Sequence, residues 1–66
     1  MKNKLIDKAI KEAGGQKSLA DLVGVSQAAV SKWRLGNKIT AENAVGIEIA
    51  TNGKVTRASL RPDLFA

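Results

Sequence analysis

Residues 16–35 run Gln16-Lys-Ser-Leu-Ala-Asp-Leu-Val-Gly-Val-Ser-Gln-Ala-Ala-Val-Ser-Lys-Trp-Arg-Leu35, a stretch that predicts two short helices joined by a tight turn. Four residues give the first helix an apolar face: Leu19, Ala20, Leu22 and Val23. Gly24 ends that helix, because glycine enters the left-handed conformation without steric cost. Val25 fills the turn. Ser26 is placed to cap a second helix by accepting a hydrogen bond from a backbone N–H.

The second helix, residues 27–35, has two different faces. Val30 and Trp33 lie three residues apart and point the same way. The other face carries small and hydrogen-bonding side chains, which fit a DNA major groove: Gln27, Ala28, Ser31 and Lys32. Trp33 is a candidate for stacking on a base, but its place opposite the polar face favours the core. Together the two helices are typical of a helix-turn-helix that binds double-stranded DNA.

Composition limits the class of protein. Sixty-six residues predict one domain, residues 1–66, with the helix-turn-helix at 16–35 and a lid or dimerisation segment at 40–66. The chain has neither Cys nor His, so we expect no metal, no cofactor and no enzymatic activity. It shows no long apolar run or signal peptide, so we expect a cytoplasmic protein of a bacterial host, associated with the nucleoid and not with a membrane.

The charge balance favours a polyanionic partner. Eleven Lys and Arg against six Asp and Glu give a formal charge of +5. A basic surface kept for solubility is the alternative. Between residues 27 and 40, however, every charge is positive. We therefore expect base contacts from Gln27, Ala28, Ser31 and Lys32. Phosphate contacts are expected from donors flanking the second helix: Gln16, Lys17, Arg34, Asn37 and Lys38.

An amphipathic helix is predicted before the helix-turn-helix, over residues 2–13. Its apolar face holds aliphatic residues and alanine without aromatic anchors, which favours a helix facing the core over one lying on a membrane. Asp7 and Lys11 are spaced for an ion pair one turn apart. Gly14-Gly15 ends this helix.

Two structures fit the chain after Thr40. Thr40 is a cap for a fourth helix that runs toward Thr51, but residues 47–57 also fit a β-hairpin that turns at Asn52-Gly53. A short helix capped by Thr56 would follow, ending before Pro62. The sequence thus predicts an all-α domain of five helices, with three helices and a C-terminal hairpin as the alternative.

The last apolar residues have two candidate roles. Leu60, Leu64 and Phe65 form either a lid over the small core or the contact of a homodimer, and the sequence leaves both open. We expect a homodimer, formed either in solution or only on DNA. The small apolar surface that remains for an interface favours the second.

Several motifs resemble one family of proteins. They are Gly15-Gln-Lys-Ser-Leu-Ala, Val25-Ser-Gln-Ala-Ala-Val-Ser-Lys-Trp33, Ile47-Glu, Thr51-Asn-Gly-Lys-Val-Thr and Leu60-Arg-Pro-Asp63. From residue 14 to residue 65 the chain is similar to the YdaS-type, Cro-like prophage proteins of the Cro and repressor superfamily. This resemblance implies a five-helix domain and a symmetric dimer that represses transcription at a pseudo-palindromic operator. The alternative is an antitoxin that binds a partner toxin and regulates its own promoter.

The resemblance also implies roles for single residues. Gln27, Ala28 and Lys32 match base-contacting positions of the repressor motif. Gln16 matches the position that touches phosphate and braces the first glutamine of the second helix. Cro-like proteins differ in their C-terminal halves, some helical and some β-stranded, so the family does not choose between helix and hairpin here.

Overall fold

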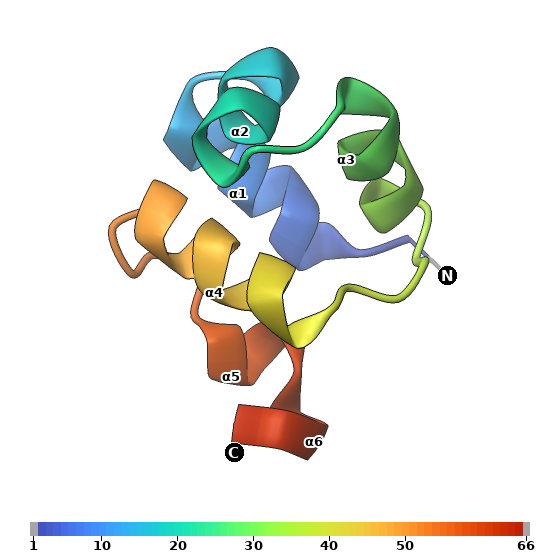
Figure 1. Ribbon diagram of the computed structural model, residues 1–66, viewed down its shortest axis with the longest axis vertical. Coiled ribbons are helices and arrows are strands. Elements are labelled where there is room, and N and C mark those ends of the chain that lie inside the picture. Colours follow the sequence, from blue (N-terminus) through green and yellow to red (C-terminus); the bar gives the residue numbers. More distant parts are fainter. Residues whose placement is uncertain (1, 66) are drawn as a thin grey trace.

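The computed structural model describes residues 2–65, which form six helices and no strand (Figure 1). They are α1 (Lys4–Ala13), α2 (Gln16–Val23), α3 (Gln27–Arg34), α4 (Ala41–Ala50), α5 (Arg57–Leu60) and α6 (Pro62–Phe65). The first three helices pack on one another, and α4 packs on α2 and α1. The two short helices follow below α4 in Figure 1, with α5 packed on α4. The predicted all-α class is confirmed. Met1 and Ala66, the ends of the predicted domain, lie outside the described residues.

A small apolar core lies between the four longer helices. Its buried residues are Ile6, Ala9, Leu19, Ala20, Val30, Trp33, Ile39, Ala44, Ile47 and Val55. Trp33 is only 4% exposed, so its predicted place in the core is confirmed. Gly46 lets α4 approach α2 closely, because a Cβ at this position would lie 3.1 Å from Cγ1 of Val23. Every helix in residues 2–65 is too short or too polar to cross a bilayer.

The helix starts follow the predicted caps. The hydroxyl of Ser26 accepts the Ala29 N–H at 3.2 Å at the start of α3. Thr40 and Thr56 accept N–H groups in the same way at the starts of α4 and α5. These side chains satisfy backbone donors that a helix cannot satisfy itself. The local sequence therefore fixes where these helices begin.

The alternative of a C-terminal hairpin is wrong. Asn52 and Gly53 have φ of +53° and +80°, the sign that a two-residue hairpin turn needs at both positions. In this chain the pair ends α4: the Gly53 N–H donates to the Glu48 carbonyl at 2.9 Å, and the Asn52 N–H donates to the Ile49 carbonyl at 3.1 Å. Asn52-Gly53 suits both a hairpin turn and the end of a helix. The caps and packing of α4 favour the helix.

Two further details differ from the sequence prediction. Pro62 follows α5 as expected but also opens α6, a sixth helix of one turn, because proline suits the first helical position. Asp7 pairs with Arg34 at 3.0 Å instead of with Lys11. The guanidinium of Arg34 offers a planar, multiply donating partner from a neighbouring helix, so the tertiary contact replaces the local pair.

Candidate nucleic-acid interface

Helices α2 and α3 form the predicted helix-turn-helix. Leu19 of α2 and Val30 of α3 are fully buried, so the two helices share the core. Between them the chain turns at Gly24, which has φ +88°, and the Gly24 N–H donates to the Ala20 carbonyl at 2.8 Å. The half-buried Val25 packs against the core at the turn. This packing leaves one side of α3 facing solvent.

The solvent face of α3 carries the predicted base-reading residues. Gln27, Ala28 and Lys32 are exposed, whereas Ser31 is half-buried. The buried Val30 and Trp33 anchor the opposite face of the same helix. A helix held in this way presents its polar face without needing to rearrange.

Gln16 connects the start of α2 to α3. Its Nε2 atom donates to the backbone carbonyl of Gln27 at 3.1 Å and to the hydroxyl of Ser31 at 2.6 Å. The resemblance implies that Gln16 braces Gln27, and the contact made here is to the backbone of that residue. The side chain of Gln27 stays exposed. Because the Ser31 oxygen accepts from Gln16, its hydroxyl proton is left to donate elsewhere.

The predicted phosphate contacts lie at both ends of α3. Lys17 is exposed near the start of α2, while Asn37 and Lys38 are exposed in the loop after α3. Gln16 is half-buried. Neither Lys32 nor Lys38 takes part in an ion pair within residues 2–65. Their ammonium groups therefore make no direct contact with a carboxylate of these residues.

Two of the predicted phosphate contacts, Lys17 and Arg34, already have acidic partners. Lys17 pairs with Asp21 at 3.4 Å, and Arg34 pairs with Asp7 at 3.0 Å. Each of these side chains is at least half exposed, and exposed ion pairs contribute about 0–1 kcal/mol to stability. A phosphate oxygen can compete for such cations at little cost.

The N-terminal residues lie beside α3, which the sequence did not predict. The Asn3 N–H donates to the Arg34 carbonyl at 2.9 Å. The Asn3 side chain caps α1 by accepting the Leu5 N–H at 3.0 Å. A shallow hollow next to α3 is lined by Lys2, Asp7, Ser31, Arg34 and Leu35. An asparagine before an apolar periodicity is a capping signal that would have indicated Asn3, but no local pattern places Lys2 beside Ser31.

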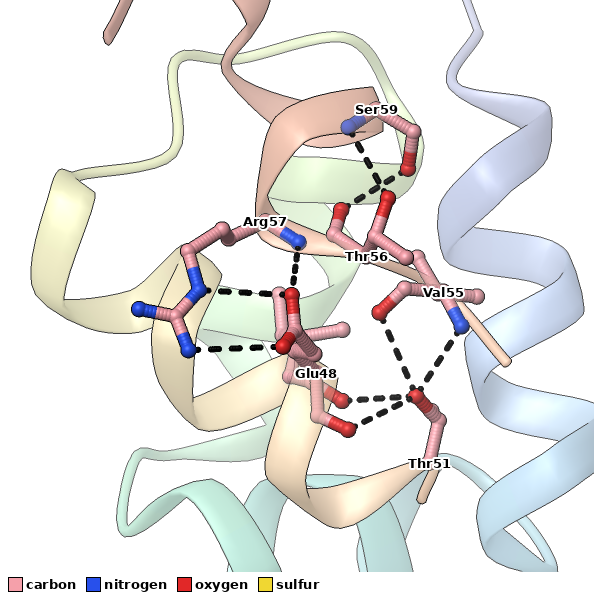
Figure 2. A network of polar contacts seen from close by, with 7 residues as sticks. Glu48, Thr51, Val55, Thr56, Arg57 and Ser59 are labelled. Carbon is pink, nitrogen blue, oxygen red and sulfur yellow. Dashed lines mark hydrogen bonds and ion pairs between the residues drawn. The ribbon is translucent and has the colours of Figure 1, made fainter. Parts of the chain in front are cut away.

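A polar network fixes the segment after α4 (Figure 2). The carboxylate of Glu48 accepts the Arg57 N–H at 2.6 Å and both Nε and NH2 of its guanidinium at 3.3 Å. These hydrogen bonds hold the pKa of Glu48 below its ordinary value, and the bond from the Arg57 backbone has the largest effect. The buried Thr51 hydroxyl donates to the Ile47 carbonyl at 2.9 Å and accepts the Val55 N–H at 3.1 Å. The network attaches α5 to α4.

The last apolar residues differ in their exposure. Leu60 and Phe65 are half-buried and pack against the core, as a lid would. The Arg57 guanidinium carbon lies 5.7 Å from the centre of the Phe65 ring, within the range of a cation–π contact. Leu64 points elsewhere and is 52% exposed. Of the three residues, Leu64 offers the most apolar surface to another molecule.

Comparison with known proteins places the chain in a family. The family model described as "Bacterial toxin YdaS" matches residues 6–66. The chain is 44% identical over 52 residues to the "Putative transcriptional regulator YdaS" of Escherichia coli K12, an alignment that covers 77% of this chain and 53% of that protein. The chain thus spans about half the length of this curated relative.

A solved structure shares the fold. It is the "Cro protein from putative prophage element Xfaso 1" of Xylella fastidiosa strain Ann-1, with a TM-score of 0.86 and 44% identity. The match covers 94% of this chain and 95% of that chain. The resemblance to YdaS-type, Cro-like proteins is confirmed, and the chain belongs to the family described as bacterial toxin YdaS.

Proposed function

We propose that this chain is a sequence-specific regulator of transcription that binds double-stranded DNA, most simply a Cro-like repressor. The observation that carries the proposal is the two-sided structure of α3. Gln27, Ala28 and Lys32 are exposed on a helix that Val30 and Trp33 anchor in the core. The likeness to a Cro protein over nearly the whole chain and the charge of +5 support it.

In this proposal α3 is the recognition helix and its N-terminal half lies in the major groove. The Gln27 carboxamide donates to and accepts from one adenine, and the Ala28 methyl packs on a thymine methyl. Lys32 donates to guanine O6 or N7. Ser31, whose oxygen is held by Gln16, donates its proton to an acceptor on a base edge.

Contacts to the DNA backbone flank the recognition helix. Lys17, Asn37 and Lys38 reach phosphates from its two ends, together with Arg34 after exchange from Asp7. Gln16 contributes its backbone N–H at the start of α2, because both of its side-chain N–H groups are bonded to Gln27 and Ser31. Two copies of the chain would occupy half-sites about 34 Å apart, one helical turn of DNA. The homodimer forms in solution or on the operator, and bound protein blocks polymerase or a competing regulator.

The test is a titration against two labelled duplexes at two salt concentrations. One duplex carries the upstream region of the protein's own gene, and the other carries the same bases in scrambled order. We expect a preference of about 10³-fold or more for the native duplex. Equal and strongly salt-dependent binding to both would contradict a sequence-specific regulator, because counterion release alone produces that pattern.

A second candidate function is that of a partner in a toxin–antitoxin pair, in particular an antitoxin that also regulates its own promoter. The family's description as a toxin leaves this candidate open, and the exposed Leu64 offers apolar surface for a partner protein. The test is co-expression with the neighbouring gene, followed by isolation of a complex. Leu64→Asp should abolish such a complex while leaving DNA binding by the same protein in place.

A further inference from the structure

Arg61 joins the C-terminal segment to the loop that follows the recognition helix. Its NH1 atom donates to the Ile39 carbonyl at 2.6 Å. Its Nε and NH2 atoms donate to the two carboxylate oxygens of Asp63 at 3.0 and 2.7 Å. The Arg61 side chain is only 12% exposed, whereas the Asp63 side chain that it holds is 60% exposed. A planar guanidinium can make these three hydrogen bonds at once, whereas the single ammonium group of lysine cannot.

The loop end of this bridge lies next to a proposed phosphate contact. Ile39 is 3% exposed, and the preceding residue, Lys38, is exposed. The hydrogen bond from Arg61 lowers the pKa of the Asp63 carboxyl, and the charge of Lys38 lowers it further by a smaller amount. Lys38 therefore lies within electrostatic range of the Arg61–Asp63 pair.

The other end of the bridge is fixed by the network of Figure 2. Glu48 holds the backbone and guanidinium of Arg57 at the first residue of α5. The Arg61 N–H donates to the Arg57 carbonyl at 2.8 Å, so Arg61 caps the C-terminal end of α5. Arg61 is thus attached to α4 through α5. Its contact with Ile39 ties the loop to a rigid part of the fold.

We propose that Arg61 is a positioning residue for the DNA backbone, holding the loop of residues 36–40 so that Lys38 meets a phosphate at the end of the recognition helix. The inference rests on the proposed function. Arg61 does not contact DNA itself in this proposal, since its side chain is 12% exposed and each of its three nitrogens already donates a hydrogen bond within the chain. In this proposal the motif Leu60-Arg-Pro-Asp63 contributes to nucleic-acid binding, although it is remote in sequence from α3.

Arg61→Lys tests this role without changing the net charge. If Lys38 loses its phosphate, the slope of log affinity against log salt becomes shallower by about one unit. The affinity ratio of wild type to variant then falls about 3.5-fold between roughly 50 and 200 mM salt. Lys54→Arg is the matched control, because it exchanges one basic residue for another in the exposed turn after α4, outside both the Arg61 bridge and the Glu48–Arg57 network. It should leave the salt slope unchanged.

A double-mutant cycle separates positioning from general destabilisation. Lys38→Ala alone should produce the same loss of slope, and Arg61→Lys in the Lys38→Ala background should add nothing. Additive losses, or an unchanged slope in Arg61→Lys, would overturn the proposal. Failure of the wild-type protein to bind any duplex would contradict the proposed function itself. Binding by wild type with additive losses contradicts the role of Arg61 alone.

A measurement on the wild-type protein covers the case in which Arg61→Lys does not fold. The side-chain nitrogen resonances of Arg61 and Lys38 are followed by NMR as duplex is added. We expect the Lys38 ammonium signal to shift and the Arg61 Nε–H signal to stay in place. An equal shift of the Arg61 signal would overturn the proposal, because Arg61 would then be a direct contact.

Discussion

The carboxamide nitrogen of Gln16 lies 2.6 Å from the hydroxyl oxygen of Ser31, so the first residue of α2 is hydrogen-bonded to the middle of α3, the proposed recognition helix. The same nitrogen donates to the Gln27 carbonyl at 3.1 Å. Gln27 and Ser31 are one helical turn apart in the chain, so the carbonyl of the first and the hydroxyl of the second lie close enough for one nitrogen to contact both. Together the two contacts resist rotation of α3 about its own axis, which would turn Gln27 and Lys32 away from a groove.

Gln16→Ala should therefore weaken both folding and DNA binding. The free energy of unfolding should fall by about 1 kcal/mol, the usual net contribution of a hydrogen bond, as measured by urea denaturation. Ser31→Ala removes only one of the two acceptors and is the matched control. In the Ser31→Ala background, Gln16→Ala should cost less than it does alone. Equal costs in both backgrounds would mean that the bond to Ser31 contributes nothing.

Gln27→Ala should relax the base preference at one position of the operator. Its side chain is exposed and does not support the core, so stability should stay within about 0.5 kcal/mol of wild type. Affinity for the specific site should fall by about 1–3 kcal/mol, while affinity for random duplex stays the same. Titration of a set of single-base operator variants measures this. An equal loss on specific and random DNA would remove Gln27 from the base-reading set.

Lys38→Ala should weaken binding to all sequences alike. Lys38 is exposed beyond the end of α3, where a phosphate and not a base edge is expected. The salt slope should fall by about one unit, as measured by titration at several ionic strengths. Lys54→Ala changes the charge equally but lies in the turn after α4, and it serves as the control. A sequence-dependent loss in Lys38→Ala would instead indicate a base contact.

The Glu48–Arg57 contact should make stability depend on pH. The hydrogen bond from the Arg57 backbone, followed by those from its side chain, lowers the pKa of Glu48 below 4.5. A lowered carboxyl pKa stabilises the fold at pH above 4.5, and this stabilisation is lost as the pH falls through the lowered value. Glu48→Gln should thus be less stable than wild type at pH 7.

The difference between Glu48→Gln and wild type should shrink as the solution is acidified. Urea midpoints between about pH 7 and pH 3 measure it, over the range in which carboxyl groups titrate. Glu12→Gln is the control, since Glu12 is exposed on α1 and lies outside this network. A difference that stays constant over the whole range would show that the charge of Glu48 is not involved.

Gly46→Ala should destabilise the contact between α4 and α2. The new methyl would lie 3.1 Å from Cγ1 of Val23. Overpacking costs about 1–3 kcal/mol, against about 0.5–1 kcal/mol gained in helix propensity, so we expect a net loss of about 1 kcal/mol. In a Val23→Ala background the space is open, and Gly46→Ala should become stabilising. Thermal or urea unfolding of the four proteins distinguishes the two effects.

The local parts of this fold could be predicted from the sequence, and the long-range parts could not. Caps such as Ser26 and helix ends such as Gly24 involve neighbours in the chain, so the pattern indicates them directly. Asp7 also had a local partner, Lys11, but Arg34, 27 residues away, took its place. No single-sequence pattern contains that separation.

The same division holds for the candidate site. The period of a helix predicts that Gln27 and Lys32 share an exposed face, as they do. That Ser31 is half-buried under Gln16, or that Arg61 reaches Ile39 from 22 residues away, follows only from how the helices pack. The choice between helix and hairpin depended on the same packing, because Asn52-Gly53 suits both turns.

Because Trp33 is buried, its fluorescence reports on α3, the proposed recognition helix. It is the chain's single tryptophan, and there is no tyrosine, so light absorbed at 295 nm excites one indole that is 4% exposed on the inner side of α3. The emission of the unlabelled protein therefore reports on the packing of α3 against the core. Its shift during unfolding marks the moment at which α3 leaves the core. Thermal unfolding followed by tryptophan fluorescence therefore measures directly the stability of the helix that is proposed to contact DNA.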